Sequence, residues 1–175
     1  MRAALFPDAI QPLLDLHSLT SITLELFNVG LSLAVSDVDV MAKSWPHLAR
    51  FSFGGSISTP TLPEVTILIA FAELFPALKE LTLHLDVTIV PSGNSIPILS
   101  HGLQKLQIGC YDIPKPVLLA QFIDSIFPYI ATDSSPWLAG SWEKVLGFVQ
   151  QFQLNVGLHA TTFTLAVEIC VARHI

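Results

Sequence analysis

The stretch WPHLARFSFGG, residues 45–55, has a near copy in FPALKELTLHL, residues 75–85. Each opens with an aromatic residue and a proline and then places three apolar residues in the template LxxLxL. These template residues are Leu48, Phe51 and Phe53 in the first copy and Leu78, Leu81 and Leu83 in the second. The last two template positions are two residues apart, so their side chains fall on the same face of a short strand. The pattern predicts a turn followed by a strand with one buried face.

The template occurs four times, which indicates an internal repeat. Its first positions are Leu19, Leu48, Leu78 and Leu103, separated by 29, 30 and 25 residues. These intervals are close to the period of leucine-rich repeats, and each is long enough for the crossover that parallel strands require. We therefore expect an α/β fold: a leucine-rich-repeat solenoid fragment of about four to five irregular repeats, in which short parallel strands alternate with helices.

The aromatic–proline pair also ends three predicted helices, the third of which stops at Phe127 and Pro128. SDVDVMAKSWP, residues 36–46, has apolar residues at i, i+3, i+4 and i+7, and Ser36 or Asp37 can cap its start. LPEVTILIAFAELFP, residues 62–76, has Pro63 in position for a first helical turn. Proline disfavours helical backbone in the residue before it, so each pair is predicted to turn the chain from a helix into the next strand.

The later part of the array is less regular. A third helix is predicted over residues 113–127, whereas the proline and glycine content of residues 84–102 predicts a loop or a single helical turn in place of a crossover helix. The repeat pattern decays after Pro128, where the array is expected to end. A last amphipathic run, residues 141–152, is predicted to cover the final strand. Residues 1–152 are thus expected to form one leucine-rich-repeat-like domain, followed by a tail, residues 153–175, whose pattern predicts no structure.

Composition excludes several classes of partner and location. The chain has 175 residues, of which 51% are hydrophobic and 13% charged, enough for one domain with a buried core. Its net charge of −6 is scattered without basic clusters, so neither nucleic acid nor a membrane is expected as a partner. The apolar run at the amino terminus is too short for a signal peptide, and no transmembrane helix is predicted. Because Cys110 and Cys170 have no metal-ligand or paired spacing, an intracellular location, cytoplasmic or nuclear, is expected.

Motifs for catalysis, cofactors or metals are not found in the sequence. The six histidines include no HExxH motif and no pair at i, i+4. The glycines and serines form no P-loop, dinucleotide-binding or GxSxG motif. Two nearby carboxylates, Asp37 and Asp39, stand at a predicted helix start, where capping and the helix dipole explain them better than a metal. The chain is therefore expected not to be an enzyme and to need no cofactor or metal.

With its repeats aligned, the chain resembles the leucine-rich-repeat region of basidiomycete fungal F-box domain-containing proteins. The resemblance covers roughly residues 9 to 152. It is carried in order by QPLLDLHSLTSITL, VSDVDVMAKSWPHLARFSF, LPEVTILIAFAELFPALKELTLHLD, LQKLQIGCYDI and PVLLAQFIDSIFPYI. One departure is Phe75, where the family often has cysteine before the proline.

The resemblance implies a role in ubiquitination. In that family the repeats recruit substrates, and an amino-terminal F-box docks on the adaptor of a cullin-type ubiquitin ligase. No F-box is found in this sequence, so the adaptor is expected as a partner only if an F-box exists upstream of Met1.

Polar residues between the template positions are the candidate site. They are expected to point to a concave sheet face, in ladders across the strands: Ser21, Thr23, Glu25, Arg50, Ser52, Glu80, Thr82, His84, Lys105 and Gln107. Arg50, Glu80 and Lys105 should alternate in sign on adjacent strands. The ladders are open to two interpretations, a solvated structural face and a surface that binds an unidentified protein partner.

Two hypotheses about function follow. The first is a protein–protein interaction scaffold that resembles the substrate-recognition repeats of an F-box ubiquitin-ligase receptor. The second is a truncated or non-functional fragment of such a protein, with no independent activity. The regular register in the middle of the array favours the first, and the irregular end of the array favours the second.

Overall fold

The structure is a computed structural model that describes residues 6–26, 33–55, 62–92, 96–110, 112–132 and 141–154. Four parallel strands form one sheet in chain order: β1 (Ser21–Leu26), β2 (Arg50–Gly55), β3 (Glu80–His84) and β4 (Lys105–Gly109). The helices are α1 (Phe6–Leu14), α2 (Val35–Ser44), α3 (Ile67–Leu74) and α4 (Pro116–Ile126), followed by a helix over residues 141–154. The predicted α/β architecture, with parallel strands alternating with helices, is confirmed.

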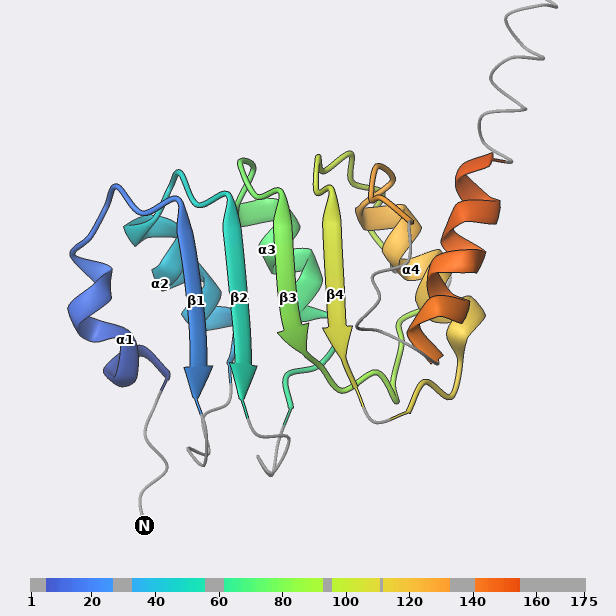
Figure 1. Cartoon of the computed structure of the whole chain (residues 1–175), viewed down its shortest axis with the longest axis horizontal. Helices are drawn as coiled ribbons and strands as arrows, with labels where there is room; N and C mark the ends of the chain where they lie inside the picture. The colour runs from blue at the N-terminus through green and yellow to red at the C-terminus, as the bar shows by residue number, and fades with distance from the viewer. Residues whose placement is uncertain are drawn as a thin grey trace, which may run out of the picture.

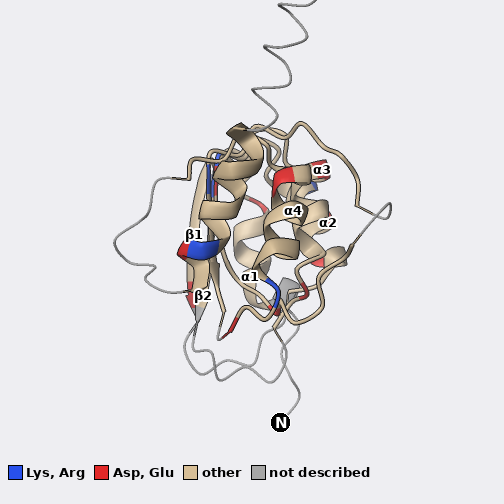
Figure 2. Cartoon of the chain, turned by 90° about the vertical axis from the view of Figure 1, so that its right-hand side faces the viewer, with Lys and Arg blue, Asp and Glu red and all other residues tan. Residues whose placement is uncertain are grey.

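The helices form a single layer on one face of the sheet. In Figure 1, α2, α3 and α4 lie behind the strands, α1 lies beside β1, and the helix over residues 141–154 lies beside α4 at the β4 end. Figure 2 shows the molecule from the side, with β1 and β2 on the left and α2, α3 and α4 on the right. No described segment covers the opposite face of the sheet, which we call the open face.

Three helices end in the same corner. The residue after the last residue of the helix is Trp45 for α2, Phe75 for α3 and Phe127 for α4. Their backbone angles are nearly the same: φ is −126°, −119° and −126°, and ψ is 64°, 71° and 67°, in that order. Each of these residues donates its N–H to the carbonyl four residues earlier, at 2.8, 3.1 and 2.7 Å. A proline follows each of them and excludes helical backbone at the aromatic residue. The predicted aromatic–proline corner is confirmed.

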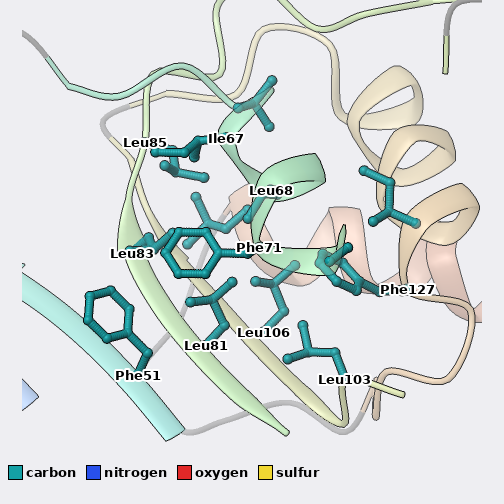
Figure 3. Packing of buried hydrophobic residues seen from close by; sticks show 14 of the residues in the cluster. Phe51, Ile67, Leu68, Phe71, Leu81, Leu83, Leu85, Leu103, Leu106 and Phe127 are labelled. Atoms are coloured by element: carbon teal, nitrogen blue, oxygen red, sulfur yellow. The ribbon is translucent and has the colours of Figure 1, made fainter. Parts of the chain in front are cut away.

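The core lies between the sheet and the helix layer. The corner aromatics Trp45, Phe75 and Phe127 are buried, and so are the template residues of β2, β3 and β4. Phe71 of α3 joins the two layers, because its ring centroid lies 5.5 Å from that of Phe51 on β2 and 5.6 Å from that of Phe75. Figure 3 shows this packing. The apolar residues that define the repeat in the sequence are therefore the residues that hold sheet and helices together.

Two predicted helix starts are wrong. For α2, the N-cap residue is Ala34, and Asp37 stands at the third helical position, where its Oδ2 accepts the Ala34 N–H at 2.8 Å. For α3, the helix begins at Ile67, because the Pro63 carbonyl accepts the Asp86 N–H at 2.9 Å. The segment before α3 is thus tied to the extension of β3 and cannot be helical.

Irregular connections complete the fold. No helix occurs among the described residues between β3 and β4, as predicted from the prolines of residues 84–102. Helix α1 was not predicted; it contains Pro12, and its buried residues Ile10 and Leu14 are four apart, on one helical face. The helix predicted over residues 141–152 is confirmed and continues to residue 154, so all but the first two residues of the predicted tail lie outside the described residues.

The row of backbone hydrogen bonds at the starts of the strands continues after β4. Equivalent backbone bonds of 2.8 Å run from Ala49 N–H to Thr20, from Lys79 N–H to Ala49, and from Gln104 N–H to Lys79. The Ala131 N–H continues the row by donating to the Gln104 carbonyl, again at 2.8 Å. This row of backbone bonds thus continues past Pro128, where the sequence pattern indicated the end of the array. Within the described residues no helix combines the length and the apolar character needed to cross a membrane.

Candidate functional site

The predicted site residues all lie on the four strands, at alternate positions. Side chains at the intervening positions point into the core, and burial alternates accordingly along β3 and β4. On β1 and at the starts of β2 and β4 the site residues are exposed, and the others are half-buried. The period of two residues in a strand thus places one polar set on the open face.

The strand register brings these residues into three rows across the sheet. The first row is Ser21, Arg50, Glu80 and Lys105; the second is Thr23, Ser52, Thr82 and Gln107. In the third row Glu25 lies opposite Gly54 and His84 lies opposite Gly109. The predicted register is confirmed for the first two ladders and, in the third, for the pairs Glu25–Gly54 and His84–Gly109.

The first row carries charges that do not pair with one another. Arg50 Nε donates to Ser21 Oγ at 3.3 Å and so leans away from Glu80. Among the described residues no ion pair joins Arg50, Glu80 and Lys105, although their signs alternate as predicted; the ion pair found there links Lys43 and Asp39 on α2. Exposed ion pairs contribute little to stability, so neighbouring charged side chains on the surface need not form ion pairs. These charges therefore stay accessible to a partner.

Neutral hydrogen-bonding groups make up the second row. Thr82 Oγ1 donates to Gln107 Oε1 at 3.3 Å, which orients both side chains along the row. Thr23 is exposed and Ser52 is half-buried. Hydroxyl and amide groups offer both donors and acceptors, so this row can bind a peptide backbone or polar side chains.

The third row combines a tight contact with an open position. The His84 ring covers Gly109 so closely that an added Cβ at residue 109 would lie 2.2 Å from His84 Cδ2. An added Cβ at Gly54, by contrast, would meet nothing within 4 Å. The His84 Nδ1 atom is buried and has no hydrogen-bond partner within the described residues. Gly54 therefore borders open space on the open face, beside the exposed Glu25. Sequence patterns did not reveal the contact between His84 and Gly109, because it depends on the direction in which the His84 ring turns.

Two other histidines have structural roles at the corners. His101 is buried; its Nδ1 accepts the Leu103 N–H at 3.1 Å, which leaves Nε2 to donate to the Phe75 carbonyl at 2.8 Å. His17 Nδ1 lies 3.0 Å from the carbonyl oxygen of Ser44, at the end of α2. Both histidines therefore tie one unit of the array to its neighbour.

Candidate reactive groups were sought outside the open face as well. Burial, and then the carboxylate of Asp112, raise the pKa of the Cys110 thiol, which disfavours its nucleophilic thiolate form. A cavity of about 250 Å³ lies between the start of α2 and residues 62–67, and among the described residues that line it Glu64 is the one with an ionisable side chain. In the described ranges no group of three His, Cys, Asp or Glu side chains is placed to hold a metal ion.

The open face is therefore the candidate site. It presents hydrogen-bonding groups in register and charges of both signs, and its described residues contain no nucleophile paired with a base. Comparisons with protein family models, with curated proteins and with solved structures found no match to this chain.

Proposed function

We propose that this chain is a protein–protein interaction scaffold that binds a partner protein on its open face. One observation carries the proposal: within the part of the chain that the structure describes, α2, α3 and α4 pack on one face of a four-stranded parallel sheet, and the other face bears polar residues in register. Parallel sheets are almost always covered on both faces, and their strands are then apolar on both sides. A parallel sheet with one polar, uncovered face is suited to present that face to another molecule.

The finer part of the proposal is a solenoid of the leucine-rich-repeat type. It is supported by strands in chain order, by corners with the same backbone angles, and by the row of backbone bonds that reaches Ala131. In such arrays each unit contacts its neighbours alone, and stacking creates an extended binding surface. The extended rows of the open face agree with this architecture.

The sequence resemblance suggests what kind of partner is bound. In F-box ubiquitin-ligase receptors the repeats hold the substrate, and we infer the same role for the open face here. Contact with the adaptor of a cullin-type ligase would require an F-box in the same polypeptide. The partner of the repeats themselves would be a substrate protein.

Cross-linking of the full chain in cells tests the proposal. Ser52→Arg places a long side chain in the middle of the open face, and Ser36→Arg makes the same change on exposed α2, in the helix layer. We expect the wild-type and Ser36→Arg chains to cross-link the same proteins and Ser52→Arg to lose them. Retention of those proteins by Ser52→Arg would contradict the proposal, as would a wild-type chain that cross-links nothing beyond an unrelated control protein.

A further inference from the structure

We propose that the outer edge of β1 binds an extended, basic segment of a partner protein, which adds to the sheet as a further parallel strand. The inference goes beyond the proposed function, because this edge is a surface separate from the open face. Three observations carry it: backbone groups of β1 without partners in the described residues, apolar side chains of β1 that are less buried than their equivalents, and the local charge.

The backbone of β1 lacks, at its outer edge, the bonds that join the other strands. At each junction two consecutive N–H groups donate to one carbonyl of the preceding strand; Ala49 and Arg50, for example, donate to the Thr20 carbonyl at 2.8 and 3.0 Å. Thr20 and Ser21 are the equivalent residues at the start of β1. Within the described residues no carbonyl accepts their N–H groups, and β1 pairs with β2 alone.

An extended chain is the occupant that this edge requires. Backbone groups of successive strand residues point to opposite edges, so Ser21, Thr23 and Glu25 direct their N–H and C=O groups outward. A further strand satisfies such a row, and strand addition is one of the ways in which proteins recognise peptides. The six residues of β1 include neither proline nor lysine, which natural edge strands use to prevent pairing. Two consecutive donors at Thr20 and Ser21, as at the other junctions, favour a parallel strand.

Apolar side chains of β1 are less buried than their equivalents in the other units. Leu24 is half-buried, whereas the residue at the same position is buried in every other strand: Phe53, Leu83 and Ile108. Leu19 is also half-buried, whereas the first template residue of each of the other three units is fully buried. Apolar residues at alternate positions of an added strand would cover Leu24 on the helix side of the sheet.

Helix α1 provides a floor for such a strand. It packs against α2, and Figure 2 shows it on the helix side of the sheet. A strand added to β1 would therefore lie over the end of α1, where Leu13 is half-buried and Leu16 is 48% exposed. The apolar side of the added strand would cover these two leucines as well.

Charge favours a basic segment at this edge. Residues 6–26, which include α1 and β1, contain Asp8, Asp15 and Glu25 and no lysine or arginine. Asp15 and Glu25 are exposed. Side chains on adjacent strands interact across the sheet, so a partner lysine beside Glu25 forms a favourable pair of opposite charges. The expected occupant is thus an extended segment with apolar residues at alternate positions and basic residues between them.

A titration with a defined peptide tests the inference. The ¹⁵N-labelled full chain is titrated with acetyl-Lys-Val-Thr-Val-Lys-Val-amide, whose valines would lie on the helix side of the sheet. We expect saturable shifts of the amide signals of Ser21, Thr23 and Glu25. Hydrogen exchange of these three amides should become slower in the complex, because they gain hydrogen-bond partners.

Methylation of the peptide backbone provides a matched control. In a parallel strand at this edge, the valine N–H groups face β1, and those of the threonine and the lysines face away. N-methylation of the first two valines should therefore weaken binding at least about tenfold, through the loss of two hydrogen bonds. N-methylation of the threonine and the second lysine should leave binding unchanged. The reverse result, or equal binding of the two methylated peptides, would overturn the inference.

Two substitutions of one residue locate the site on the chain. Thr23→Pro removes an outward N–H and leaves the ladder with β2 intact, a place where edge strands tolerate proline, so it should abolish the shifts. Thr23→Ala removes the side chain and keeps the N–H, so it should bind the peptide as wild type does. Absence of saturable shifts in wild type, or equal binding by Thr23→Pro and Thr23→Ala, would also overturn the inference. Unchanged amide signals of β3 and β4 check that both variants keep the fold.

Discussion

At the scale of single residues, the third row shows how one side chain can limit the size of the residue beside it. Gly109 has no side chain because the His84 ring occupies the position that a Cβ would take. Gly54, in the same row, faces open space. The His84 ring thus leaves no room for a side chain at Gly109, whereas Gly54 has room for one. Substituting each glycine by alanine should therefore change the stability of the fold by different amounts.

Gly109→Ala should destabilise the fold by about 1–3 kcal/mol, because the His84 ring must move out of its contact. Gly54→Ala is the matched control and should be neutral or slightly stabilising, since alanine loses less backbone entropy than glycine on folding. The measurement is the free energy of unfolding by urea. In a His84→Ala background the cost of Gly109→Ala should disappear; a cost that persists there would show that the ring is not its cause.

Two carboxylates should affect stability in opposite directions as pH changes. Burial raises the pKa of the Asp124 carboxyl above 3.8, so the folded chain holds this proton more tightly than the unfolded chain. Stability then falls as pH rises through the window between the two pKa values. Asp124→Asn should therefore raise the melting temperature above that window and give no gain at pH values below 3.8.

Asp86 is the counterpart, because hydrogen bonds from the hydroxyl and the backbone N–H of Thr88 lower the pKa of its carboxyl below 3.8. Its stabilisation is present above the unfolded pKa and is lost as pH falls through the folded pKa. Asp86→Asn should lower the melting temperature at neutral pH, and the deficit should vanish in strong acid. Thermal melts between pH 2 and pH 7 check both variants, and shifts of the same sign would contradict the assignment.

At the scale of elements, the aromatic–proline corner is the device that joins each helix to the next strand. Trp45 is fully buried, and its Nε1 donates to the Leu13 carbonyl at 3.0 Å, so this corner also anchors the end of α1. Trp45→Ala should cost about 3–5 kcal/mol of unfolding free energy, through the cavity and the lost bond. Arg50→Ala, on the exposed side of the neighbouring strand, should cost little. Chemical denaturation measures both, and equally small effects would contradict the corner's role in the core.

His101 should be the more important of the two corner histidines. His101→Ala leaves the Phe75 carbonyl and the Leu103 N–H buried without partners, which should cost about 1–3 kcal/mol or more. His17→Ala is the matched control, because His17 is exposed and water can replace its bond to Ser44. Urea unfolding of the two variants measures the difference. A cost for His17→Ala as large as that for His101→Ala would disprove the assignment.

The elements that could be predicted from the sequence are those determined by residues close together in the chain. The corners at Trp45 and Phe75 follow from proline chemistry, and the strand register follows from the template spacing, so both were correct. The starts of α2 and α3 were misplaced because Asp37 and Pro63 find partners that sequence periodicity does not reveal. At the site, the rows were predictable from register, whereas the turn of the His84 ring depends on contacts with the neighbouring strand.

At the scale of the whole molecule, the fold has one helix layer, one core and one open face. The apolar residues of the template serve the core, and the polar residues between them form the open face. At the β4 end, the helix over residues 141–154 buries Trp142 and Val149, and Gln153 Nε2 donates to the Pro128 carbonyl at 3.0 Å. This helix therefore covers the last corner, at Phe127 and Pro128.

The central claim is that the open face, and not the helix layer, binds the partner. Its most direct test is the dissociation constant between the purified full chain and a protein recovered by cross-linking, measured by calorimetry for three chains. Relative to wild type, Ser52→Arg should weaken binding by about tenfold or more, a change of about 1.4 kcal/mol. Ser36→Arg, on α2, should bind as wild type does. Equal affinities for Ser52→Arg and wild type, or a loss confined to Ser36→Arg, would contradict the claim.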